Sequence, residues 1–167
     1  MLGDLVNSGR SEAMTTSEPK VCLEIGSRTE NVELVQIAVK ASLQQLRIDT
    51  ETSQAIGTAV REAVANAIQH GNGMDPDKQV RVECSFDGDE VVIQVRDQGN
   101  GFDPKQVPDP LDPDNLMRPN GRGIFFMKKF MDDIQFSFEP AGGTVVTMRK
   151  RVTLQPPAAS QEEEDER

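Results

Sequence analysis

The chain is organised around one stretch, Arg61-Glu62-Ala63-Val64-Ala65-Asn66-Ala67-Ile68-Gln69-His70-Gly71-Asn72. Its apolar residues recur at helical spacing and form a face that must be buried. This face consists of Ala63, Val64, Ala67 and Ile68 in the stretch, and it continues before the stretch with Ile56 and Val60. Beside it, Glu62, Asn66 and His70 stand at i, i+4 and i+8, which predicts a single ridge. Gly71 is expected to end the helix, because glycine accepts the left-handed conformation.

Two interpretations of this ridge are open. In one, Glu62 is a surface charge, Asn66 is neutral and His70 sits favourably at a helix C-terminus. In the other, a carboxylate, an amide and an imidazole lie along the margin of an apolar stripe because they do chemistry there. Plain solubility does not require polar groups at that margin. The ridge is therefore a candidate functional site.

Composition excludes several classes of function. The chain has 167 residues, with 28 acidic against 18 basic ones and a net charge of −10. One domain is the expectation for this length. The acidity argues against direct nucleic-acid binding, which rests on Lys and Arg, and suits a partner with a basic surface. No apolar run approaches the roughly 18 residues that span a bilayer, so neither membrane association nor a secretory signal is expected. We expect a cytoplasmic protein.

The two cysteines and the single histidine make a zinc site improbable. Cys22 and Cys84 lie far apart, without the spacing of metal ligands. Both are interpreted as small core residues of a cytosolic protein.

Along the chain, residues 1–19 predict a disordered leader, 20–152 the folded domain and 153–167 an acidic disordered tail. The expected elements, in order, are a strand at 21–25, a helix from Thr29 or Asn31 to about Arg47, a helix from Asp49 or Thr50 through the ridge, strands at 80–86 and 90–97 joined by a hairpin at Asp87-Gly88, a helix at 124–131, and strands at 134–138 and 144–152. The proline-rich residues 103–120 predict a lid or a disordered loop.

This order of elements predicts an α+β fold. Hairpin-linked strands indicate a mixed, mainly antiparallel sheet, with the helices packed on one face as a two-layer sandwich. The repeats of a doubly wound dinucleotide-binding fold are missing. Gly99-x-Gly101 also lacks the third glycine and following helix of the dinucleotide fingerprint.

Four motifs carry a resemblance to a known family. They are Glu62-x-x-x-Asn66-Ala67-x-x-His70-Gly71, Asp97-x-Gly99-x-Gly101-Phe102, Gly121-Arg122-Gly123-Ile124 and Gly143-Thr144. In this order they resemble the GHKL ATPase superfamily, and among its members the anti-sigma factor serine/threonine kinases. The resemblance extends over roughly residues 20–152. It implies the GHKL type of two-layer sandwich with an ATP lid, and ATP and Mg²⁺ as cofactors.

The resemblance also implies roles for single residues. Asn66 would hold magnesium, His70 would support the metal shell or the following loop, and Asp97 would accept a hydrogen bond from the adenine amino group. Gly99 and Gly101 would let the backbone approach the base and take positive φ. Thr144 would reach adenine through water, although it is equally interpretable as an ordinary strand residue. For Asp97 the alternative is a turn-forming aspartate before glycine.

The phosphates are expected at the start of the helix near residue 124. Gly121 and Gly123 would leave N–H groups free for them, and Arg122 or Arg118 would add a charged contact. Glu62 would be the catalytic base that takes the proton of an attacking hydroxyl.

The implied function is an anti-sigma factor kinase. It would phosphorylate an anti-sigma factor antagonist on serine or threonine and sequester a sigma factor when the antagonist is unavailable, as a homodimer. A non-catalytic, nucleotide-gated binding module is the alternative. A histidine-kinase-like ATP-binding core is a weaker one, since no upstream helical hairpin with a phosphoacceptor histidine is evident.

Overall fold

The computed structural model describes residues 21–100 and 122–156, and there it has one five-stranded sheet. The strands are β1 (Val21–Gly26), β2 (Gln79–Asp87), β3 (Glu90–Arg96), β4 (Asp133–Phe138) and β5 (Thr144–Arg151). Their order across the sheet is β1-β2-β3-β5-β4, and every neighbouring pair is antiparallel. The α+β prediction is confirmed, and the described pairs include no parallel one.

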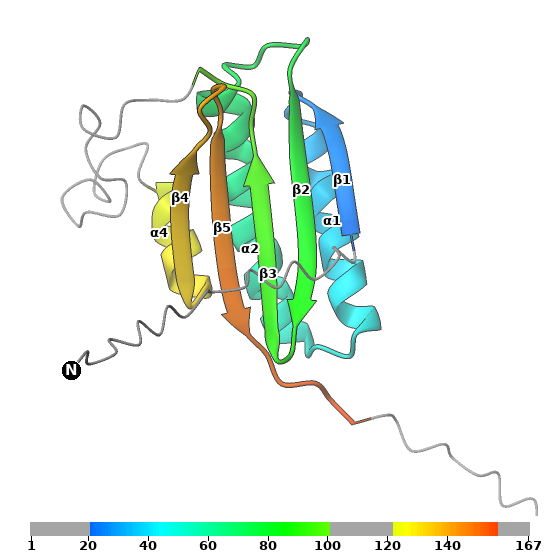
Figure 1. Ribbon diagram of the computed structural model, residues 1–167. Coiled ribbons are helices and arrows are strands. Elements are labelled where there is room, and N and C mark those ends of the chain that lie inside the picture. Colours follow the sequence, from blue (N-terminus) through cyan, green and yellow to red (C-terminus); the bar gives the residue numbers. More distant parts are fainter. Residues whose placement is uncertain (1–20, 101–121, 157–167) are drawn as a thin grey trace, which may run out of the picture.

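The helices all cover the same face of this sheet (Figure 1). They are α1 (Asn31–Gln45), α2 (Thr50–Asn66), a π-helical turn η1 (Ala67–Gly71) and α4 (Arg122–Phe130). The predicted apolar stripe of α2 is buried throughout, and it packs against the alternating apolar residues of β2 and β3. Burial of such a stripe is the main source of helix stability in proteins, so the core itself positions the ridge.

The two long helices begin in different ways. Asp49 caps α2, since its side chain accepts a hydrogen bond from the backbone N–H of Thr52 at 2.8 Å. This confirms one of the two predicted starts. α1 begins at Asn31, one of its two predicted starts, but neither Thr29 nor Asn31 caps it: Glu30 occupies the N-cap position without a side-chain hydrogen bond, and the side chain of Asn31 donates to the carbonyl of Gly26.

The hairpin between β2 and β3 is confirmed, with its turn one residue later than predicted. Asp87 pairs with Glu90, so Gly88 and Asp89 form the turn. Gly88 has φ 61°, which suits the first central position of a type II′ turn, where glycine is preferred.

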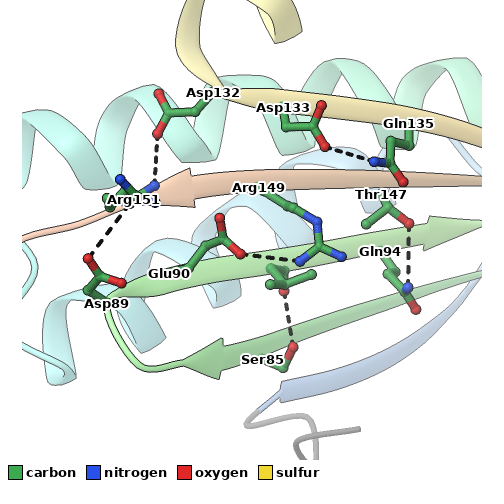
Figure 2. Close-up of polar contacts among 11 residues, drawn as sticks. Ser85, Asp89, Glu90, Gln94, Asp132, Asp133, Gln135, Thr147, Arg149 and Arg151 are labelled. Carbon is green, nitrogen blue, oxygen red and sulfur yellow. Dashed lines mark hydrogen bonds and ion pairs between the residues drawn. The ribbon is translucent and has the colours of Figure 1, made fainter. Parts of the chain in front are cut away.

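The face of the sheet that the helices leave open carries polar pairs between strands (Figure 2). Arg149 meets Glu90 at 3.2 Å, and the side chain of Gln94 donates to Thr147 Oγ1 at 3.4 Å. The ion pair between the partly exposed side chains of Arg149 and Glu90 contributes little to stability. Both pairs keep the open face of the sheet polar.

The chain that follows β5 stays attached to the fold as far as it is described. The backbone N–H of Gln155 donates to the carbonyl of Arg47 at 2.9 Å, and Leu154 forms a β-bridge with Ile48. The predicted leader, the predicted lid at residues 103–120 and residues 157–167 of the predicted tail lie outside the described residues. No helix in the described ranges is both long and apolar enough to cross a membrane.

The two cysteines lie in opposite environments. Cys84 lies on β2 and is buried in the core, as predicted, and burial raises the pKa of its thiol to about 11. Cys22 is exposed, so its assignment to the core was wrong. Its neighbours Val21 and Leu23 take the core side of β1, and alternation along a strand sends Cys22 to the open face.

This difference predicts one reactive thiol in the native protein. The thiolate is the reactive form of cysteine. Cys84 is buried, and because its pKa is about 11 it is a neutral thiol at pH 8. We expect a maleimide to label the native chain once, on Cys22, and the unfolded chain twice, as counted by intact mass. Two rapid labels in the native protein would contradict the burial of Cys84.

Candidate functional site

The ridge predicted from the sequence is interrupted by a change of helix type. The α-helix ends at Asn66, and residues 67–71 continue as the π turn η1, in which the N–H of Asn72 bonds the carbonyl of Ala67 at 2.7 Å. Glu62 and Asn66, one turn apart, are half-buried, whereas His70 is exposed. A π turn has more residues than an α turn, so His70 leaves the line of the other two. The prediction of an α-helix through His70 was therefore wrong, and π turns of this kind are frequent at functional sites.

Gly71 was predicted to end the helix in a left-handed conformation, but it is not among the residues with positive φ, so this prediction was wrong. In the segment that follows η1, the residues with positive φ are Gly73 at 64° and Met74 at 59°. What Gly71 provides is space, because a Cβ there would lie 2.3 Å from Oδ2 of Asp97. The π turn and the end of β3 therefore touch at this glycine.

Asp97 lies at the centre of this contact and is only 6% exposed. Its Oδ1 accepts hydrogen bonds from the backbone N–H groups of Gly99, at 2.9 Å, and Thr144, at 3.0 Å. The bond from Gly99 is the one expected if Asp97 is a turn-forming aspartate before glycine, the alternative given above for this residue. Within the described residues both donors meet Oδ1, which leaves the lone pairs of Oδ2 for another donor. An amino group of a ligand fits that requirement.

Glycines allow the backbone to close around Asp97. A Cβ on Gly99 would lie 2.2 Å from the carbonyl oxygen of Gly71, and one on Gly143 would lie 2.5 Å from the carbonyl oxygen of Asp97. Gly143 has φ 108°, but Gly99 is not among the residues with positive φ. The expectation of positive φ at Gly99 was wrong, and close approach to Gly71 is its role. Gly101 lies outside the described residues.

The first turn of α4 meets the ridge on α2. A Cβ on Gly123 would lie 3.0 Å from Oε2 of Glu62 and 3.3 Å from Nδ2 of Asn66. The first N–H groups of a helix have no partner within it and carry positive partial charge, so they attract phosphates. Glu62 and Asn66 are thus brought next to Gly123, which is far from them in sequence. Arg122 begins α4 and is exposed, whereas Gly121 and Arg118 lie outside the described residues.

The proposed ligand contacts of Thr144 and Asn66 are not tested by the structure. Thr144 is half-buried at the start of β5, where its backbone exchanges hydrogen bonds with Asp97. The proposed contact of its hydroxyl with adenine stays a prediction. Asn66 as a magnesium ligand also stays a prediction. The described residues hold no group of three or more His, Cys, Asp or Glu that could bind a metal, and Mg²⁺ bound mainly by waters and phosphates needs only one or two protein ligands.

Asn72 is the polar residue of the site that the sequence did not single out. It is 3% exposed, and its side chain bonds the backbone after β3 and at the start of β2. The position of this polar side chain between Gly71 and Gly73 was the only feature of the sequence that could have pointed to Asn72. It was ambiguous, because Asn is common in turns that face solvent.

Comparison with known proteins gives one consistent result. The family model for the histidine kinase-like ATPase domain matches residues 25–150. The anti-sigma F factor of Clostridium beijerinckii is 33% identical over 142 residues, which are 83% of this chain and 98% of that protein. The anti-sigma F factor of Oceanobacillus iheyensis is 31% identical over 80% of this chain and 93% of its own.

Solved structures agree at the level of the fold. The crystal structure of the RsbU and RsbW domains of a Mycobacterium tuberculosis protein superposes with a TM-score of 0.58 at 21% identity. The match covers 83% of this chain and 34% of that larger one. A mycobacterial sensor histidine kinase, MprB, gives a TM-score of 0.52 at 18% identity, with 81% of this chain and all of that chain covered.

Proposed function

Since the chain belongs to the histidine kinase-like ATPase domain family, and within it to the group that contains the anti-sigma F factors, we propose that it is an anti-sigma factor with serine/threonine protein kinase activity. Its cofactors are ATP and Mg²⁺. Its protein substrate is an anti-sigma factor antagonist, and when the antagonist is unavailable it sequesters a sigma factor.

The observation that carries this proposal is the meeting of α2 and α4. Glu62 and Asn66 lie against Gly123, in the first turn of a helix whose N–H groups point outward from its start. Phosphoryl transfer needs mainly positioning and neutralisation of charge. The helix start supplies donors for phosphate oxygens, Asn66 supplies an amide oxygen for the metal, and Glu62 supplies a base within the same small region.

Asp97 recognises the nucleotide base in this proposal. An ionised carboxylate accepts a hydrogen bond from the amino group of adenine and repels the carbonyl oxygen that guanine has at the same place. When bound, Mg-ATP supplies the phosphoryl group to be transferred. Glu62 then holds the serine or threonine hydroxyl of the substrate and takes its proton.

Partner binding requires surface outside this pocket. On α1, Leu34 is 61% exposed and Ile37 is 57% exposed, and β1 beside it is an edge strand of the sheet. Exposed apolar side chains next to an open edge are suited to protein contact, and we assign them to the homodimer. The net charge of −10 favours a basic surface on the sigma factor.

The test is a phosphotransfer assay with candidate antagonists. The purified chain is incubated with Mg-ATP and each candidate, and mass spectrometry identifies any phosphorylated residue. We expect phosphoserine or phosphothreonine on one antagonist, and recovery of a sigma factor with the chain when that antagonist is omitted. Nucleotide-dependent partner binding without phosphorylation of any candidate would contradict kinase activity and favour the non-catalytic binding module.

A further inference from the structure

We propose that Asn72 is a positioning residue that holds Asp97 in place and thereby determines the preference for adenine over guanine. The proposal rests on the proposed function only in taking Asp97 as the group that meets the base. No part of it depends on phosphoryl transfer. Asn72 itself is 3% exposed and is not expected to touch the ligand.

The amide of Asn72 joins three segments that are distant in sequence. Its Nδ2 donates to Ser27 Oγ at 2.7 Å, just after β1, and to the carbonyl of Gln79 at 2.9 Å, at the start of β2. Its Oδ1 accepts from the backbone N–H of Gln98 at 2.7 Å, directly after Asp97. Ser27 is itself buried and donates to the carbonyl of Lys78 at 3.0 Å. The amide is therefore fixed in one orientation, because donors and acceptors are both matched.

These bonds act next to the carboxylate of Asp97. The residue before Asn72 is Gly71, which faces Asp97 Oδ2 closely enough to exclude a Cβ. The residue held by Asn72 Oδ1 is Gln98, whose own side chain accepts from the N–H of Gln79 at 2.7 Å. Asn72 thus locks the π turn and the segment after β3 to each other on both sides of the carboxylate.

Base selectivity depends on this fixed position. The carboxylate favours an amino group and disfavours a carbonyl oxygen only while it cannot move away or admit a water between itself and the base. Loss of the Asn72 amide leaves the N–H of Gln98 without its partner and frees the segment that carries Asp97. We therefore expect the affinity for adenine nucleotides to fall, and the penalty against guanine nucleotides to fall with it.

The experiment compares Asn72→Ala with a matched control, Asn31→Ala. Asn31 also donates a side-chain hydrogen bond to backbone near the end of β1, to the carbonyl of Gly26 at 2.9 Å, but it does not bond the segment after Asp97. Calorimetry with MgADP and MgGDP gives the two dissociation constants, and thermal unfolding gives stability. We expect Asn72→Ala to weaken ADP binding about 10-fold and to lower the ADP-to-GDP selectivity at least about 5-fold. Asn31→Ala should keep the selectivity of the unaltered chain.

A second variant, Ser27→Ala, is measured whether or not Asn72→Ala folds. Ser27 supports the amide of Asn72, and its loss should reduce selectivity about 2- to 3-fold in the same direction. Unchanged selectivity in each folded variant, beside an unaltered chain that binds ADP, would overturn the role of Asn72 and leave the proposed function standing. An unaltered chain that binds neither nucleotide would overturn both.

Discussion

Glu62→Gln is expected to lower phosphotransfer to the antagonist by about 10²- to 10⁴-fold, the usual contribution of a general base. The substituted amide has almost the same shape and keeps the contact with the first turn of α4, where Oε2 of Glu62 faces Gly123. It cannot take a proton from the attacking hydroxyl. Nucleotide affinity should stay within about 3-fold, since in the proposed mechanism Glu62 contacts the substrate hydroxyl rather than adenine. Single-turnover transfer and calorimetry measure the two quantities separately.

The control for this variant is Glu51→Gln, which removes an exposed acidic residue from the first turn of the same helix. It should leave transfer and binding unchanged. Transfer by Glu62→Gln at the rate of the unaltered chain would remove Glu62 from the mechanism. Loss of nucleotide binding in this variant would indicate that Glu62 serves the structure of the pocket instead.

Gly99→Ala is expected to lower the affinity for MgADP at least about 10-fold. The added methyl group would lie 2.2 Å from the carbonyl oxygen of Gly71 and 3.0 Å from Oδ1 of Asp97. The nearer of these atoms belongs to the backbone, which cannot rotate away as a flexible side chain could. The segment after β3 must therefore shift, at a typical cost of about 1–3 kcal/mol, and the shift moves the Asp97 carboxylate, which we propose meets adenine.

Gly26→Ala provides the comparison, because a Cβ at Gly26 meets nothing within 4 Å. It should bind MgADP as the unaltered chain does. Equal affinity in Gly99→Ala and Gly26→Ala would show that the close approach of residues 71 and 99 is dispensable. A fall in both would point to a general effect on folding, which thermal unfolding would reveal.

The site was only partly evident before the fold was known. The motifs that carry the family resemblance pointed to Glu62, Asn66, Asp97 and Gly123 as candidates, and the structure places Glu62 and Asn66 next to Gly123. The motifs did not point to Asn72, whose side chain bonds Ser27, Gln79 and Gln98. Hydrogen bonds between residues so far apart leave no periodic signal in the sequence.

Some predictions of local structure were also wrong because tertiary contacts, which the sequence does not show, decide the local conformation. An α-helix through His70 and a left-handed Gly71 are reasonable for an isolated helix. The folded chain adopts a π turn there, with Gly71 packed against Asp97. Cys22 was assigned to the core because cysteines are commonly buried, but the register of β1 directs it to the open face.

The sequence by itself determined the class of fold, the order of its elements and the residues of the α2 stripe, because periodic burial is written into neighbouring residues. Only the tertiary structure decided which of these elements meet. The distance from α4 to Glu62, the glycine contacts around Asp97 and the bonds of Asn72 are set by packing across the sandwich. Such contacts depend on the whole core, and no local stretch of the chain encodes them alone.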